Sequence, residues 1–122
     1  MTRATDTPRQ AKTWGENLPV TPADQPAVAV ARIKAGFASS VHKHPLRSNL
    51  FLVLSGQLQV FVHGEAPPTG AGCPTTVDLG VDQQLTVPAG VWHQFWALTD
   101  VVLLEVYSPA VAAPDADIVR LT

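Results

Sequence analysis

The sequence has few of the features that mark secreted or membrane proteins. It has one cysteine, Cys73, in 122 residues, so no disulfide can form within the chain. A chain without disulfides is typical of a reducing compartment. The polar stretch 1–12 lacks the apolar core of a secretory signal, and no apolar run is long enough to cross a bilayer. We therefore expect a cytoplasmic protein with no membrane partner.

Charged residues are also scarce. Only 15% of the residues are charged, the formal net charge is −2, and the eight Lys and Arg residues form no cluster. Nucleic-acid binding needs a basic patch or stripe, so we expect no nucleic-acid partner. At 46% hydrophobic residues, the chain has the composition and length of one folded domain.

Helical periodicity is nearly absent. From Trp14 onward, Pro and Gly recur about every ten residues and break every window in which apolar residues could follow a helical spacing. Short β-rich runs lie between these breaks, and Gly56 marks a tight reversal between two of them. This spacing predicts an all-β sandwich or barrel. The expected strands are 28–35, 39–44, 49–55, 57–63, 75–79, 84–88, 92–98 and 101–107.

Two segments outside this pattern divide the chain. Residues 1–12 show neither strand nor helix periodicity and are expected to be a flexible N-terminal tail. Residues 13–122 are expected to form a single domain. Within it, the Gly- and Pro-rich stretch 64–75 predicts a surface loop that carries Cys73, to which we assign no role.

The strand at 49–55 is apolar on both faces. Side chains alternate along a strand, so Leu50, Leu52 and Leu54 point one way, while Asn49 and the residues that alternate with it point the other. A strand of this kind needs cover on both sides. A second layer of the same domain could supply the outer cover, but we favour a homodimer.

Three of the four histidines have a spacing that suits a metal ion. His42 and His44 stand two residues apart on an expected strand, so their side chains leave the same face about 6.6 Å apart at the Cα atoms. Two imidazoles at that separation can bind one ion. His93 follows the turn Pro88-Ala89-Gly90, which sets where the next strand begins. Alternatively, each histidine is a hydrogen-bonded core residue.

At these positions the chain resembles the cupin superfamily. The first cupin motif reads Gly, five residues, His-x-His, three or four residues, Glu, six residues, Gly. In this chain Gly36, His42, His44 and Gly56 fall in that register, and Asn49 stands in place of the Glu.

The second cupin motif reads Gly, five residues, Pro-x-Gly, two residues, His, three residues, Asn. Pro88, Gly90 and His93 match it, whereas Asp82 replaces the first Gly and Ala97 replaces the Asn. The resemblance spans about residues 28–108. It implies a double-stranded β-helix, the jelly-roll barrel of the cupins, although cupins host many unrelated activities.

The resemblance further implies that His42, His44 and His93 hold a divalent transition metal inside the barrel, with Asn49 at the position of a fourth ligand. An amide oxygen is neutral and a poorer ligand than a carboxylate, so three neutral imidazoles would leave positions open for water, O₂ or a substrate. The site charge would stay near +2, which favours anionic ligands. Imidazole-rich sites suit Fe, Ni, Cu and Zn, and we include Mn among the metals that this site could hold. Alternatively, the chain has kept the cupin fold and lost the ability to bind a metal.

Strand alternation predicts the surroundings of the metal. Phe51 and Val53 share a face with Asn49, and Phe95 and Ala97 share a face with His93. We expect them to line an apolar pocket for a small-molecule ligand. The opposite face of the expected strand 92–98 carries residues expected to pack or to form an interface: Trp92, Gln94 and Trp96.

Two further titratable residues remain. Glu105 could reach the cavity as a catalytic acid or base, or could be an edge-strand charge that discourages aggregation. His63 ends a strand on the face of Gln57 and is expected to be a surface or structural residue.

A second, shorter resemblance is to the cupin domain of bacterial mannose-6-phosphate isomerases. It rests on Trp14-Gly15, on LLEV at 103–106 and on the segment Asp117 to Arg120. It implies metal-assisted proton transfer on a phosphosugar, with Arg120 as the phosphate contact. Thr13 stands where that family usually has Pro.

Several functions follow from these observations. The leading hypothesis is a metal-dependent enzyme acting on a small organic molecule, either a dioxygenase or a sugar isomerase. The alternative is a non-catalytic metal or small-ligand binding module. A metal-free sugar epimerase ranks last, because Tyr107 is the only tyrosine. Since imidazole binds metal only when neutral, we expect metal release below about pH 6.

Overall fold

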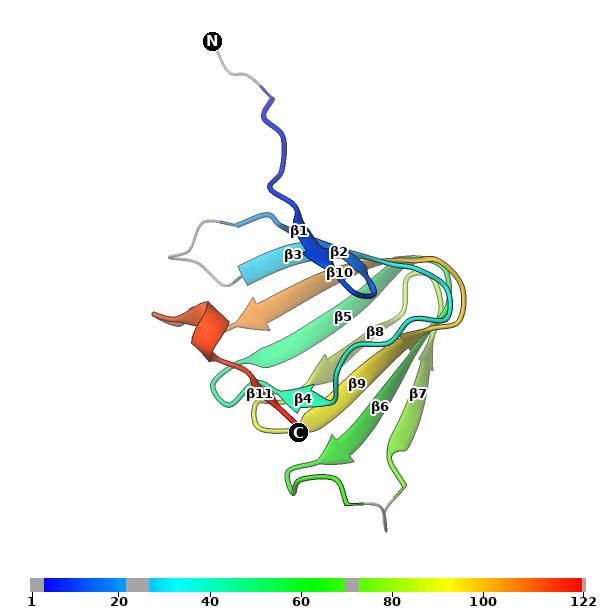
Figure 1. The fold of residues 1–122 in the computed structure, drawn as a ribbon, viewed down its shortest axis with the longest axis vertical. Helices are drawn as coiled ribbons and strands as arrows, with labels where there is room; N and C mark the ends of the chain where they lie inside the picture. Colours follow the sequence, from blue (N-terminus) through cyan, green and yellow to red (C-terminus); the bar gives the residue numbers. More distant parts are fainter. Residues whose placement is uncertain (1–3, 22–26, 70–72, 122) are drawn as a thin grey trace.

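The computed structural model describes residues 4–21, 27–69 and 73–121, and it is an all-β protein, as the sequence predicts (Figure 1). The strands are β1 (Gln10–Lys12), β2 (Gly15–Pro19), β3 (Ala27–Ile33), β4 (His42–Lys43), β5 (Ser48–Ser55), β6 (Leu58–Gly64), β7 (Thr75–Leu79), β8 (Gln84–Val87), β9 (Trp92–Ala97), β10 (Val101–Ser108) and β11 (Val119–Arg120). Within the described residues, the one helical element is a single 3-10 turn, η1 (Pro114–Ala116).

The strands form two antiparallel sheets. The first sheet has the order β1-β2-β3-β10-β5-β8, and the second has the order β11-β4-β9-β6-β7. The chain crosses between the sheets, so β10 pairs with both β3 and β5 although these strands lie far apart in sequence. Figure 1 shows the two sheets facing each other across the core. This arrangement is the jelly roll that the cupin resemblance implies.

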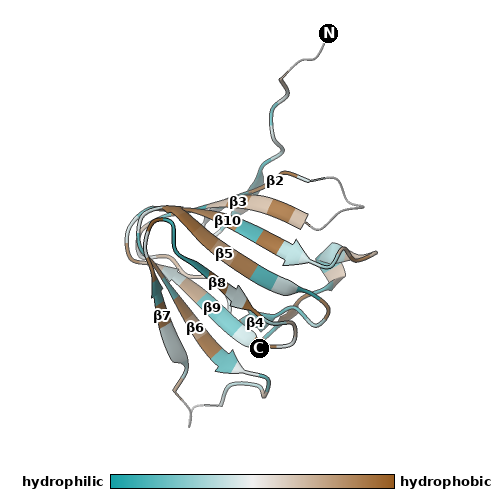
Figure 2. Ribbon diagram, turned by 180° about the vertical axis from the view of Figure 1, so that it is seen from behind, coloured by the Kyte–Doolittle hydropathy of each residue, from teal (hydrophilic) through white to brown (hydrophobic). Residues whose placement is uncertain are grey.

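The core fills the space between the sheets. Phe51 and Val53 on β5 point into it, and Leu58 and Val60 on β6 meet them from the other sheet, all at most 1% exposed. The alternate side chains of β5 lie on the outer face, where Leu54 is 46% exposed. The predicted alternation along β5 is therefore confirmed. Figure 2 shows β5 as hydrophobic along most of its length, because both of its faces are apolar.

The tight reversal predicted at Gly56 joins β5 to β6. Gly56 has a φ of 89°, and a Cβ atom there would lie 2.1 Å from the carbonyl oxygen of Asp100. Only glycine allows this close approach without moving the neighbouring backbone.

The structure differs from the expected strands at the ends of the chain. Residues 10–12, predicted as part of a flexible tail, form β1 and pair with β2. The strands β2 and β11 were also not predicted. Of the expected strand at 39–44, only His42–Lys43 is in β4. These strands are two to five residues long and carry no alternating pattern, so their pairing depends on tertiary contacts that periodicity does not show.

Candidate metal centre

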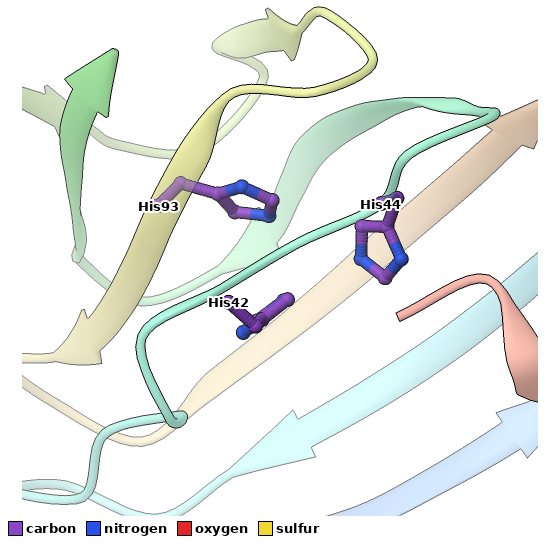
Figure 3. A group of neighbouring side chains, drawn as sticks. All are labelled: His42, His44 and His93. Carbon is purple, nitrogen blue, oxygen red and sulfur yellow. The ribbon is translucent and has the colours of Figure 1, made fainter. Parts of the chain in front are cut away.

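Three histidines from two sequence regions meet at one point inside the barrel (Figure 3). His42 on β4 is the cross-strand partner of His93 on β9, and His44 follows β4 directly. Their potential ligand nitrogens all lie within 4.8 Å of one another. All three are buried, with His93 only 1% exposed. The structure thus brings together the residues that the spacing singled out.

In each of the three histidines, Nδ1 is engaged by a backbone carbonyl, which leaves Nε2 to bind a metal. The Nδ1–H of His42 donates to the carbonyl oxygen of Ser40 at 2.8 Å, and the Nδ1–H of His93 donates to that of Val91 at 2.9 Å. The Nδ1–H of His44 donates to the carbonyl oxygen of Asp117 at 2.8 Å. A carbonyl can only accept, so in the neutral rings the lone pair lies on Nε2.

The Nε2 atoms of the histidines have no hydrogen-bond partner in the part of the chain that the structure describes. Those of His44 and His93 are buried and make no hydrogen bond with the described residues. A histidine with a purely structural role would normally use a buried nitrogen in a hydrogen bond, since leaving it unpaired is costly. The donor set therefore fits a divalent transition metal, which binds imidazole Nε2 through this lone pair.

Burial keeps these rings neutral. It lowers the pKa of His42 to about 3, with a further contribution from repulsion by His93, and it lowers the pKa of His93 to about 4. The pKa of His44 is lowered as well, again mainly by burial. Neutral imidazoles at ordinary pH are the form that binds metal.

A turn links the two halves of the site. Gly90 has a φ of 80°, and its backbone N–H donates to the carbonyl oxygen of His44 at 2.9 Å. The turn that precedes His93 is thereby attached to the segment that carries the other two histidines.

Asp82, which stands where the cupin motif has its first Gly, has a φ of 68°. Aspartate tolerates this left-handed conformation better than most residues, so the replacement keeps the turn.

The C-terminal segment contributes a residue that sequence reasoning missed. Asp117 accepts the hydrogen bond from His44 through its backbone, and its side chain forms a buried ion pair with Arg47, with Nε to Oδ2 at 2.8 Å. The Asp117 Oδ1 also accepts the backbone N–H of Leu46 at 2.7 Å. Asp117 therefore couples the segment after β10 to the candidate ligand His44. No local pattern could show this, because the partners are about 70 residues apart.

Asn49 lies on the inner face of β5 and is 1% exposed. Neither its amide oxygen nor its amide nitrogen has a hydrogen-bond partner among the described residues. Its cross-strand neighbour Tyr107 has its ring centroid 5.1 Å from that of His44. Asn49 thus lies one cross-strand pair away from the ring that contacts His44, with an amide group that is free to bind.

A cavity of about 410 Å³ opens next to the histidines. It is lined by His42, His44, Phe95, Glu105 and Tyr107, among others. It shares His44 and Tyr107 with an adjacent, larger cavity of about 590 Å³. The site is therefore connected to space of the size that small organic ligands occupy.

Of the four expected pocket residues, only Phe95 lines this cavity. Phe51, Val53 and Ala97 are at most 1% exposed and belong to the closed hydrophobic core. Alternation correctly gave their inward direction. It could not show that the two sheets pack tightly at these positions and leave open space only nearer the histidines.

Glu105 faces the cavity from β10. This strand lies in the middle of its sheet, between β3 and β5, so the interpretation of Glu105 as an edge-strand charge is wrong. Burial raises the pKa of Glu105 to about 7, while its hydrogen bond with Tyr107 acts in the opposite direction. Burial also raises the pKa of Tyr107, and the nearby Glu105 carboxyl group adds to the shift.

The remaining candidates lie around the site. Arg120 pairs with His42 across the β11–β4 ladder and lines both cavities. His63 lies at an irregularity in the β6–β9 register and is outside the three-histidine cluster. On the outer side of β9, Trp92 is 4% exposed beneath the Lys43 ammonium, whereas Trp96 is 43% exposed.

Comparison with known families places the chain in one of them. The sequence profile of the cupin domain matches residues 29–107, which is more than half of the chain. The chain belongs to the cupin family. Among the described residues, no helix is long and apolar enough to cross a membrane. No curated protein sequence matches the chain significantly.

Solved structures of several cupin proteins superpose on this fold. The capsular polysaccharide assembling protein CapF from Staphylococcus aureus does so with a TM-score of 0.80 at 19% identity, covering 97% of this chain and 33% of that one. Oxalate decarboxylase from Bacillus subtilis gives a TM-score of 0.77 at 20% identity, covering 95% of this chain and 30% of that one. The chain thus spans about a third of the length of these proteins, and the likeness is one of fold.

Proposed function

We propose that this cupin is a metal-dependent enzyme that acts on a small organic molecule in the cavity beside His42, His44 and His93. The observation that carries the proposal is the set of three buried imidazoles whose Nδ1 atoms are all engaged by backbone carbonyls. Their Nε2 atoms are left to share one ion. The metal is a divalent transition metal such as Fe, Ni, Zn, Cu or Mn.

Among the possible reactions, the cavity favours a proton transfer of the isomerase type. A divalent ion on the three histidines would supply Lewis acidity toward a substrate oxygen. Glu105 lines the same cavity, and a carboxyl group with a pKa near 7 is suited to accept and return a proton at neutral pH. Tyr107 lines the same cavity and lowers the pKa of Glu105 against the larger effect of burial.

A dioxygenase-type reaction is the second candidate. It is favoured by Asn49, which stands where the family motif has a carboxylate ligand. A ligand set of three neutral imidazoles leaves open positions and a site charge near +2, which suits a chelating substrate together with O₂. In that reaction Glu105 would orient the substrate instead of carrying a proton.

The two reactions respond differently to one variant. Glu105→Gln keeps the size of the side chain and removes the titratable carboxyl group. For proton transfer we expect kcat to fall by about 10²- to 10⁴-fold with metal content unchanged. We also expect the wild-type rate to decline below about pH 7, where Glu105 becomes protonated.

The assay compares aldose–ketose conversion with O₂ uptake for protein loaded separately with Fe, Ni, Mn and Zn. Glu65→Gln, a change on the exposed loop after β6, serves as the matched control. Metal binding without turnover in either assay would instead support a binding module. Turnover that survives complete removal of metal would support the metal-free epimerase.

A further inference from the structure

The segment after β10 connects the two sheets at the end of the barrel that holds the histidines. It comprises residues 109–121, which we call the strap. The strap leaves the larger sheet at the end of β10 and joins the smaller sheet as β11, next to β4 (Figure 1). Ile118 and Arg120 of the strap line both cavities, and so does His44. The strap is therefore part of the wall of the space beside the histidines.

The strap contributes little to the hydrophobic core. The structure describes all of 109–121, and within this range Asp117 alone is buried. The turn η1 has no buried residue, and the apolar residues of the strap are half-buried or exposed. Burial of apolar side chains is the dominant favourable contribution to holding a segment in a folded protein. The strap therefore lacks the contribution that holds the strands of the barrel in place.

Polar contacts hold the strap instead, and they converge on Asp117 and Arg47. Asp117 accepts hydrogen bonds from Nδ1 of His44 and from Nε of Arg47, both at 2.8 Å. Arg47 also donates to the carbonyl oxygen of Pro114 at 3.1 Å, and its guanidinium group lies 4.7 Å from the ring centroid of Tyr107. Since Arg47 directly precedes β5, this one side chain attaches the strap to the barrel.

An ion pair of this kind can separate reversibly. Removing one partner by mutation leaves a buried charge without compensation, and this is strongly destabilising. When both partners instead separate into water, each charge regains its hydration, which offsets much of the lost attraction. The strands of the barrel, by contrast, cannot separate without exposing the apolar core. Opening of the strap is therefore the less costly movement.

The metal site requires a movement of this kind. The Nε2 atoms of His44 and His93 are buried, and an ion has to reach both of them to bind. His93 lies on β9, which is paired with β4 on one side and with β6 on the other. The strap is hydrogen-bonded to His44, and it can move without exposing a buried apolar side chain.

We propose that the strap opens and closes over the cavity, and that separation of Arg47 from Asp117 opens the route by which a metal ion and an organic ligand reach the three histidines. The inference rests on the proposed function, because it concerns access to the same site. The strap is closed both before and after binding. Fixing it in the closed position therefore changes the rates of binding and release and leaves the equilibrium affinity unchanged.

A reversible disulfide that fixes the strap tests this inference. Val119 in the strap and Lys43 in β4 are cross-strand partners, and partners in an antiparallel ladder lie close enough for a disulfide. Lys43→Cys with Val119→Cys, in a Cys73→Ser background that removes the exposed free thiol, holds the strap when oxidised and releases it when reduced. The matched control is Gln59→Cys with Asp78→Cys, a pair that joins β6 to β7 in the same sheet and leaves the strap free.

Stopped-flow absorption of Co²⁺ measures the rates of metal binding and release. We expect oxidation of the strap pair to slow both rates at least about tenfold, while the dissociation constant changes by less than about twofold. Oxidation of the control pair should change neither quantity. Equal rates for the oxidised and the reduced strap pair would overturn the inference, and so would a change in affinity without a change in rate.

Hydrogen exchange of the metal-free protein tests the opening without a metal. The backbone N–H of Leu46 donates to Oδ1 of Asp117 at 2.7 Å, and that of Leu121 donates to the carbonyl oxygen of Val41 at 2.9 Å. We expect both amides to exchange at least about tenfold faster than the core amide of Val53, and to slow when the strap pair is oxidised. Exchange of both at the rate of Val53 would overturn the inference. Failure of the wild type to bind Co²⁺ would instead overturn the proposed function, while hydrogen exchange would still show whether the strap opens.

Discussion

At the scale of single residues, the account depends on buried polar atoms that the protein leaves unpaired. Asn49 has two such atoms, and His44 and His93 have one each. Unpaired buried polar atoms are normally removed because each costs about 1–3 kcal/mol. Those of His44 and His93 lie within 4.8 Å of each other, and an ion that pairs with both explains why they are left without a hydrogen bond.

Replacing Asn49 by Glu tests this explanation. Asn49→Glu supplies an anionic oxygen at the position of the carboxylate in the cupin motif. We expect metal affinity to rise by about tenfold or more, whereas the metal-free protein becomes less stable because a buried carboxylate lacks a partner. Competition with a metal indicator and thermal unfolding with and without metal measure the two effects. Unchanged metal affinity would place Asn49 outside the metal's reach.

The depressed histidine pKa values predict how the metal-free protein responds to acid. His42 and His93 are neutral in the folded chain down to about pH 3 and 4, whereas imidazoles in the unfolded chain bind protons below about 6.5. The unfolded state therefore binds more protons in this range, and the free energy of unfolding falls as pH falls. Glu105 acts in the opposite direction between about pH 7 and 4.5, since its pKa is raised in the folded state.

On unfolding in this range, His42 and His93 together take up about two protons and Glu105 releases about one. The net uptake is therefore about one proton, and His44 adds to it. We expect the free energy of unfolding of the metal-free protein to fall by at least about 1.4 kcal/mol per pH unit between pH 6.5 and 4.5. Urea titrations across this range measure the slope, and a flat profile would contradict the pKa assignments. The same pKa values move the expected metal release from below about pH 6, the value for ordinary imidazole, toward pH 4.

At the scale of structural elements, the segment after β10 functions as part of the metal site. Asp117 accepts the Nδ1–H of His44 and pairs with Arg47, and Arg47 also donates to the carbonyl oxygen of Pro114 at 3.1 Å. The backbone N–H of Leu121 donates to the carbonyl oxygen of Val41 at 2.9 Å. These bonds fix the C-terminal segment across the opening next to the histidines.

Asp117→Asn tests this coupling. Breaking a buried ion pair by neutralising one partner costs about 3–5 kcal/mol, and disturbing a group that orients a ligand lowers metal affinity by about 10- to 100-fold. We expect both effects in Asp117→Asn and neither in Asp115→Asn, because Asp115 lies in the same segment but is exposed. Chemical unfolding and metal competition assays measure them. Full metal affinity in a folded Asp117→Asn protein would refute the positioning role.

The extent to which the sequence predicts this structure varies from element to element. Strands with an apolar face, such as β5 and β10, follow directly from their alternation, and the spacing of His42, His44 and His93 indicates a common point. That Glu105 does not lie on an edge strand became clear only from the central place of β10 in its sheet. The carbonyl oxygens that orient the histidines were not predictable, since any residue supplies a carbonyl and only the fold brings it into position.

At the scale of the whole molecule, the outer face of the larger sheet is apolar across several strands. Leu52, Leu104 and Val30 are successive cross-strand partners on β5, β10 and β3, and they form a partly exposed row on the side opposite the core. A second row contains Leu50, Val106 and Val28. Contiguous apolar surface of this kind is typical of protein interfaces. We propose that two copies of the chain associate through this face.

Leu52→Glu and Leu104→Glu place a charge in the centre of the row. If the dimer forms there, light scattering coupled to size exclusion should report a dimer for the wild type and a monomer for both variants. Thr76→Glu, on the exposed edge strand β7 of the other sheet, should remain dimeric. A wild-type protein that is monomeric at tens of micromolar would contradict this interface.

The central claim is that three histidines hold one metal ion inside the barrel, and the Co²⁺ content of His93→Ala tests it most directly. The control is His63→Ala, which removes the histidine outside the cluster. We predict one Co²⁺ per chain for the wild type and for His63→Ala, and a loss of affinity of more than about 100-fold for His93→Ala with its β-sheet circular dichroism retained. Stoichiometric, tightly bound Co²⁺ in folded His93→Ala would contradict the account.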